Sequence, residues 1–204
     1  MPTIIDALYG QNREAIEIIS SANEISIASD VDNKLKKHLI MAAASYFETE
    51  VRGAIENLVT VASGSNPAII ALVKQKALER QYHTYFDWER RNANRFFGHF
   101  GEKFSNKCKE EVKAQEELGE SISAFIELGE MRNKLAHLNF AQFPFDKTSE
   151  EIYSLYQKAL QFLEYIKKSL NEASAFETRA KEALPAHEIV PPAVKNDATL
   201  PPLP

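Results

Sequence analysis

The placement of proline constrains the fold of this chain more than any other feature of its sequence. Only Pro2, Pro67 and Pro144 precede residue 184, whereas six of the nine prolines lie in the last twenty-one residues. Proline removes a backbone donor and breaks helices, so the long proline-free stretches are free to form them. The chain also has only seven glycines and few stretches rich in β-branched residues. The sequence predicts one all-α domain over residues 1–183, followed by a disordered Pro-rich tail over residues 184–204.

Apolar residues recur at three- and four-residue steps along the proline-free stretches, as one face of a helix requires. The pattern predicts helices over about 14–22, 32–62, 67–80, 115–137 and 149–183. Ser65 or Asn66 can cap the third of these, because Pro67 suits a first helical turn. Thr148 or Ser149 caps the last, after Phe143-Pro144-Phe145 has interrupted the chain. These ranges and their short connections predict an antiparallel bundle of four to six helices.

Cysteine content and hydropathy exclude several classes of protein. Cys108 is the only cysteine, so no disulfide can form within the chain and no cysteine metal cluster exists. His83 and His99 have no metal-ligand spacing with a carboxylate or cysteine, so we expect neither a metal nor a cofactor. The N-terminus lacks a signal-peptide pattern, and no apolar run approaches the ~18 residues that cross a bilayer. We expect a cytoplasmic protein without membrane contact.

Basic residues gather in one part of this acidic chain. Residues 74–113 contain ten Lys or Arg and six Asp or Glu, although the net charge of the chain is −5. Aromatic residues from Tyr82 to Phe97 alternate with cations there, and such rings can stack on unpaired bases while cations contact phosphates. We expect RNA contacts from Arg90, Arg91, Arg95 and Lys134. The alternative is that the rings pack in the core and the charges are solvated.

The segment Arg132-Asn133-Lys134-Leu135-Ala136-His137 combines side chains suited to phosphate chemistry. Arginine can hold phosphate oxygens with paired hydrogen bonds, and histidine can move a proton at a ribose hydroxyl near neutral pH. Asn133 could orient either the imidazole or the phosphate. Five residues along a helix correspond to about 140° of rotation, so Arg132 and His137 do not share a face, although they can flank one cleft.

The position of Arg132 on its helix is also unusual. It lies only about −20° from Phe125 by ideal rotation, near the centre of the apolar stripe. A guanidinium there needs a partner anion or a polar hollow. The alternative is an ordinary structural role, in which Arg132 pairs with Glu130 or another acid and His137 interacts with the helix C-terminus.

The six-residue segment resembles the Arg-x4–6-His motif of the HEPN superfamily, including the polar residue directly after the arginine. Ala44-Ser45-Tyr46-Phe47-Glu48 and Phe96-Phe97-Gly98-His99-Phe100-Gly101 extend the resemblance to the RiboL-PSP-HEPN branch, over roughly Asp32 to Leu170. The resemblance implies a helical bundle that forms a homodimer around a composite cleft. It further implies a metal-independent ribonuclease of toxin–antitoxin or antiviral systems, held in check by an antitoxin or another defence partner protein.

The resemblance also assigns roles to single residues. Arg132 would bind and stabilise the phosphate, His137 would be the acid or base, and Asn133 would assist. The reaction would be attack of a ribose 2′-hydroxyl on the adjacent phosphate, giving a 2′,3′-cyclic phosphate. Glu48 and Glu50 lie at opposite borders of the apolar stripe of the 32–62 helix, and Glu48 matches the acidic position of the family better.

Two other functions fit the same sequence. One is a HEPN-like module without catalytic activity, which dimerises or scaffolds another protein. The other is a helical partner of a nucleotidyltransferase, whose Arg132–His137 surface receives a nucleotide or a covalent modification.

Overall fold

The structure, a computed structural model, describes residues 2–137 and 146–182, and all regular elements in these ranges are helical. They are α1 (Ile4–Ser21), α2 (Ile25–Ala62), α3 (Pro67–Val73), a π-helical turn η1 (Lys74–Leu78), α4 (Tyr82–Tyr85), α5 (Asn94–Gly98), α6 (Glu102–Ala114), α7 (Glu116–His137) and α8 (Ser149–Glu182). The predicted all-α class is confirmed. Within the described ranges the long helices are α1, α2, α6, α7 and α8, and the other three have seven residues or fewer.

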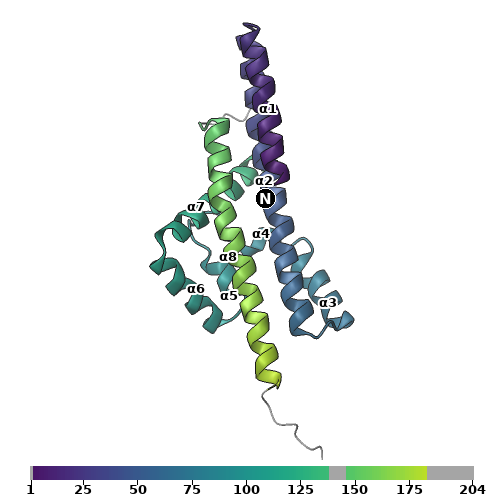
Figure 1. Cartoon of the computed structure of the whole chain (residues 1–204). Coiled ribbons are helices and arrows are strands. Elements are labelled where there is room, and N and C mark those ends of the chain that lie inside the picture. The colour runs from purple at the N-terminus through teal and green to yellow at the C-terminus, as the bar shows by residue number, and fades with distance from the viewer. Residues whose placement is uncertain (1, 138–145, 183–204) are drawn as a thin grey trace, which may run out of the picture.

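The core lies where α8 packs against α2 and α7 (Figure 1). The inner face of α8 is almost inaccessible to solvent, and Tyr156 and Phe162 are both 0% exposed. Phe47 of α2 contacts Tyr156 of α8 and Phe125 of α7, with ring centroids 5.6 and 5.1 Å apart. These rings join the three helices into one apolar core, because aromatic side chains bury the largest areas.

The directions of the helices follow from their connections and contacts. The α1 and α2 helices form an antiparallel hairpin (Figure 1). In contrast, α2 and α8 run in the same direction: the contacts between them advance from Asp32–Ser149 through Glu50–Lys167 to Asn57–Asn171. A short connection makes two consecutive helices antiparallel, but it does not fix the relative direction of helices that are further apart in the chain. Several elements separate α2 from α8, so these two helices can pack in parallel.

The ends of the helices use the capping residues that the sequence supplies. Asn66 Oδ1 accepts hydrogen bonds from the amides of Ala68 and Ile69, with Pro67 in the first turn, as predicted. At the start of α8, Thr148 Oγ1 accepts from the Glu151 amide at 3.1 Å, and Glu151 Oε2 accepts from the Thr148 amide at 2.7 Å. This reciprocal pair is a capping box, so Thr148 rather than Ser149 is the cap.

Two helix starts differ from the sequence-based expectation. The α1 helix begins at Ile4 rather than near residue 14, because Thr3 and Asp6 form a capping box there. The α2 helix begins at Ile25 rather than residue 32, and its added turns pack on α1, where Ala28 is buried. The Phe143-Pro144-Phe145 break and the predicted tail lie outside the described residues. In the described ranges, none of the helices has the length and hydropathy needed to cross a membrane.

Candidate functional site

A cavity of ≈ 630 Å³ opens between α2, α7 and the segment that carries α4. This volume is within the range of about 300–1,000 Å³ that small-molecule sites have. Four of the residues that line it are the sequence-predicted candidates for catalysis. The lining residues are Ala44, Phe47, Glu48, Arg80, Tyr82, His83, Trp88, Phe125, Gly129, Arg132, Asn133 and His137.

The inner wall of this cavity is aromatic. Phe47 and Phe125 are 2% and 1% exposed and belong also to the core. Trp88 lies in the loop after α4, its ring centroid 6.3 Å from that of Phe125, and its Nε1 donates a hydrogen bond to the His83 carbonyl at 2.9 Å. A Cβ atom at Gly129 would overlap Trp88 Cζ3 and Cε3. Glycine at 129 therefore lets the indole lie against α7, one turn before Arg132.

We expect Gly129→Ala to displace Trp88 and remodel the cavity. The added methyl group takes the place of the indole, which overpacks the site and lowers the free energy of unfolding by about 1–3 kcal/mol. Trp88 is the only tryptophan in the chain, so its fluorescence emission should shift to longer wavelength as the ring becomes exposed.

Gly119→Ala is the matched control on the same helix. A Cβ atom at Gly119 meets no atom within 4 Å. This variant should gain about 0.5–1 kcal/mol of stability and keep the emission of the wild type, since alanine favours helix over glycine. Wild-type emission in Gly129→Ala as well would contradict the assigned contact.

Arg132 is half-buried beside the cavity, and its charge is not neutralised by a described acid. Its Nη1 donates a hydrogen bond to Asn133 Oδ1 at 3.3 Å. The sequence left open that Arg132 pairs with Glu130. Glu130 instead pairs with Lys134 at 2.6 Å and with Arg91 at 3.5 Å. Among the described residues Arg132 forms no ion pair. A guanidinium in this position is ready to bind an anion from outside.

His137 is the last residue of α7 and is exposed. It lines the same cavity as Arg132. The two residues are about 140° apart around the helix axis, so the hollow lies against the part of the helix surface between them. The geometry allows an imidazole and a guanidinium to act on one group bound in the cavity.

The structure separates the two candidate glutamates. Glu48 lines the cavity, and its nearest cation within α2 is Arg52, 3.9 Å away. Glu50 instead forms an ion pair with Lys167 of α8, at 2.8 Å. Glu48 is therefore the acid on the side of Arg132, whereas Glu50 joins α2 to α8.

Tyr82 adds a hydroxyl group near these charges. Burial raises the pKa of Tyr82 well above its usual value, and the Glu48 carboxylate raises it further. The Arg132 guanidinium acts in the opposite direction. Both charges therefore lie close enough to Tyr82 to affect its pKa. Because burial is the largest effect, the hydroxyl stays protonated at neutral pH.

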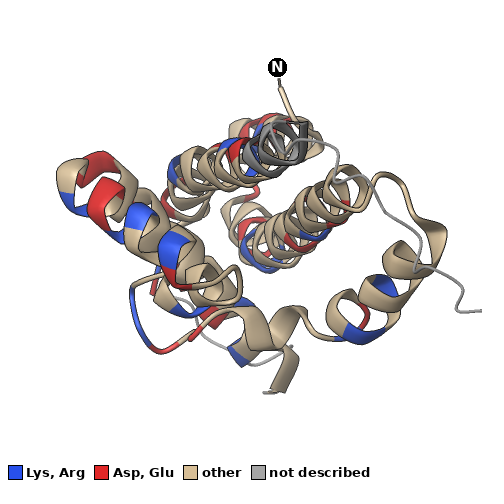
Figure 2. Cartoon of the chain, turned by 90° about the horizontal axis from the view of Figure 1, so that it is seen from below, with Lys and Arg blue, Asp and Glu red and all other residues tan. Residues whose placement is uncertain are grey.

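None of the four cations expected to contact RNA lines the cavity. Arg90 and Arg95 are exposed, and Arg90 pairs with Asp87 at 3.3 Å. Arg91 bridges the Trp88 loop to α7, because its Nη1 lies 2.7 Å from Glu127 Oε2 and also donates to the Ser123 carbonyl. Figure 2 shows cations and acids interspersed along the helices rather than separated on two faces.

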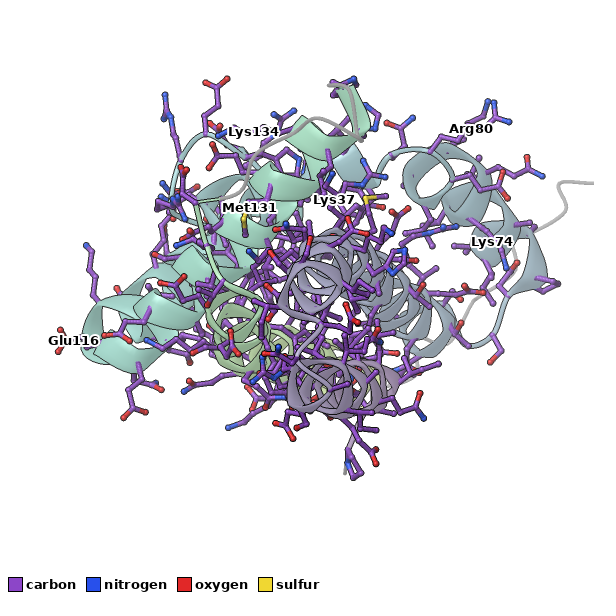
Figure 3. The ribbon with its side chains drawn as sticks, turned by 90° about the horizontal axis from the view of Figure 1, so that it is seen from above. Lys37, Lys74, Arg80, Glu116, Met131 and Lys134 are labelled. Carbon is purple, nitrogen blue, oxygen red and sulfur yellow. The ribbon has the colours of Figure 1, made fainter. Side chains whose placement is uncertain are left out.

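Four of the lining residues that were not predicted as site residues come from residues 80–88: Arg80, Tyr82, His83 and Trp88. Three of them were considered only as part of the aromatic and basic segment. Arg80 has a positive backbone φ of 58°, which is uncommon for a residue other than glycine. Its side chain lies at the outer edge of the molecule (Figure 3). The sequence feature that could have identified these lining residues is the aromatic and basic composition of residues 80–91.

The described residues also contain a cysteine and a second cavity outside the site described above. Cys108 is fully buried, and burial raises the pKa of its thiol, as expected of a structural residue. A second cavity, of ≈ 430 Å³, lies between α2, α4 and α5 and contains no predicted site residue. No group of three or more His, Cys, Asp or Glu side chains in the described ranges could hold a metal ion.

Comparison with known proteins identifies a family. A family model described as RiboL-PSP-HEPN matches residues 6–172, which include most of α1, all of α2 to α7 and most of α8. Searches of curated proteins and of solved structures found no match.

Proposed function

The chain belongs to the RiboL-PSP-HEPN family, and on that premise we propose that it is a metal-independent endoribonuclease. We propose further that it acts in the cytoplasm as a toxin or an antiviral effector, under the control of an antitoxin or defence partner. One observation carries the enzymatic proposal: Arg132, without an ion pair among the described residues, lines the same cavity as His137. This arrangement offers a phosphate both a positive charge and a proton-transfer group.

The proposed reaction needs only the nucleic acid and these side chains. The ribose 2′-oxygen bonds to the neighbouring phosphorus while the bond from phosphorus to the 5′-oxygen breaks. The proton of the 2′-hydroxyl passes to a base, and the departing 5′-oxygen takes one from an acid. Arg132 holds the nonbridging oxygens, whose negative charge grows in the transition state, and His137 carries one of the two protons. The products are a 2′,3′-cyclic phosphate and a 5′-hydroxyl.

Asn133 and Glu48 complete the proposed site as supporting groups. The hydrogen bond from Arg132 to Asn133 restricts the guanidinium to one orientation. Glu48 supplies a negative charge on the opposite wall, which attracts the Arg132 guanidinium. The positive charge of Arg132 remains available to the phosphate.

We propose outer RNA contacts from Arg90 and Arg95, which are exposed. Arg91 and Lys134 are exposed candidates as well, and these two, like Arg90, must each first leave a carboxylate partner. Exposed cations attract the nucleic acid backbone without reading its sequence.

We also propose that two copies of the chain share the catalytic cleft. Because His137 is exposed at the end of α7, a twofold-related chain can approach it and supply the second proton-transfer group. Light scattering at micromolar concentration should then show a dimer, and dilution should lower the cleavage rate per chain.

The purified protein should cleave RNA in the presence of a metal chelator and leave 2′,3′-cyclic phosphate ends. Mapping of the RNA ends checks both the reaction and its products. Cleavage that requires an added metal ion would contradict the mechanism. A dimer that binds RNA without cleaving it would instead favour the non-catalytic module, and a strict monomer with full activity would remove the shared cleft.

A further inference from the structure

The Tyr82 hydroxyl is a polar group of the cavity that the proposed reaction leaves without a role. Tyr82 is the first residue of α4, and its ring is held by aromatic neighbours: the centroids of Tyr85, Phe86 and Trp88 lie 5.9, 6.0 and 5.8 Å away. Such packing fixes the ring, so the position of its hydroxyl is fixed as well.

Tyr82 lines the cavity, and the hydroxyl is the polar end of its side chain. Among the described residues Tyr82 has no hydrogen-bond partner. Tyr82 is half-buried, and its side chain lines the cavity. A polar atom in this state gains a hydrogen bond when a ligand enters.

The charges around the hydroxyl indicate which ligand group would lie there. Glu48 and Arg132 both act electrostatically on Tyr82. An anion held by Arg132 is therefore near a hydroxyl that burial keeps protonated. Short hydrogen bonds from neutral hydroxyls to anionic oxygens are strong, so the pair suits a phosphate.

The aromatic residues that line the cavity indicate whether the bound nucleotide is paired or unpaired. Phe47, Trp88 and Phe125 line the cavity beside these polar groups, and a base can stack on an aromatic ring. A nucleotide has the size of ligands that such cavities enclose. A base within a duplex is already stacked and paired, so it must leave the duplex before it can enter.

On the basis of the proposed function, we propose that the cavity binds one unpaired nucleotide and that the Tyr82 hydroxyl donates a hydrogen bond to its phosphate beside Arg132. Tyr82 is thus a substrate-binding residue of the same site. The substrate class is RNA with an unpaired nucleotide at the cleavage position.

Tyr82→Phe tests this proposal because it removes one oxygen and keeps the ring. The probe is a fluorescent single-stranded 2′-fluoro oligonucleotide, which lacks the attacking hydroxyl and so reports binding alone. The dissociation constant should rise about tenfold, as for loss of one hydrogen bond to a charged group. The duplex of the same oligonucleotide should bind wild type at least about tenfold more weakly, given the few kcal/mol that extrusion of a base costs.

Tyr85→Phe is the control on the same short helix. The Tyr85 hydroxyl donates to the Ala77 carbonyl and lines the second cavity, so its loss should leave oligonucleotide binding unchanged. Wild-type affinity in Tyr82→Phe, with weaker binding in Arg132→Ala, would overturn the role of Tyr82 and leave the ribonuclease proposal standing. Equal affinity for duplex and single strand would overturn the unpaired substrate class. Binding that is insensitive to Arg132→Ala would overturn the phosphate site itself.

Discussion

Replacement of His137 by alanine is expected to lower the rate of RNA cleavage by about 10²–10⁴-fold, the usual contribution of a general acid or base. The imidazole lines the cavity that Arg132 also lines, and it is the one histidine side chain that α7 contributes to this cavity. Because His137 is exposed at the helix end, its loss should leave the melting temperature close to that of wild type. Single-turnover cleavage with a metal chelator present is the measurement.

His38→Ala is the appropriate control for this experiment. His38 is an exposed histidine on α2 that lines neither cavity, so its replacement should leave the cleavage rate unchanged. Equal rates in wild type and both variants would remove His137 from the mechanism. Retained oligonucleotide binding in His137→Ala would identify the loss as one of chemistry rather than of affinity.

Phe125→Ala is expected to cause the largest loss of stability, about 3–5 kcal/mol in the free energy of unfolding. Phe125 is 1% exposed and contacts the rings of Phe47, Phe86 and Phe162, with centroids 5.1, 4.9 and 5.1 Å away. Its removal leaves a void where three helices and the α4 loop meet. Total stabilities of domains are about 5–15 kcal/mol, so this one substitution removes a large fraction of the total.

Denaturant unfolding monitored by circular dichroism measures this loss, and Phe104→Ala provides the comparison. Phe104 is only partly buried on α6, and its ring contacts that of Phe100, with centroids 5.2 Å apart. It should therefore lose much less stability than Phe125→Ala. Similar losses in the two variants would mean that Phe125 is not the centre of the core.

Much of the fold could be predicted because helix formation depends on residues close together in sequence. The spacing of apolar residues identified α7 and α8 to within one residue at each end. Pro67 and Asn66 predicted the start of α3 from local capping chemistry alone. The starts of α1 and α2 were misplaced because their first turns are weakly periodic and are stabilised by a capping box and by contact between the two helices.

Less of the site could be predicted, because its residues come from distant parts of the chain. The sequence proposed Arg132 and His137 from their chemistry and from the resemblance to the HEPN motif. It could not find Tyr82 or Trp88 as lining residues, since their side chains equally suit an ordinary core. Nor could it predict that Arg91, an arginine in a basic segment, would pair with Glu127 and fasten the Trp88 loop to α7.

The sequence by itself determined the helical class and the ends of α7 and α8, because these depend on neighbours within a few turns of chain. Only the tertiary structure decided that Glu48 rather than Glu50 lines the cavity, and that Trp88 lies over Gly129. These outcomes follow from how α8 packs on α2 and how the α4 loop crosses α7. Such contacts join residues that are far apart in the chain, and local periodicity carries no information about them.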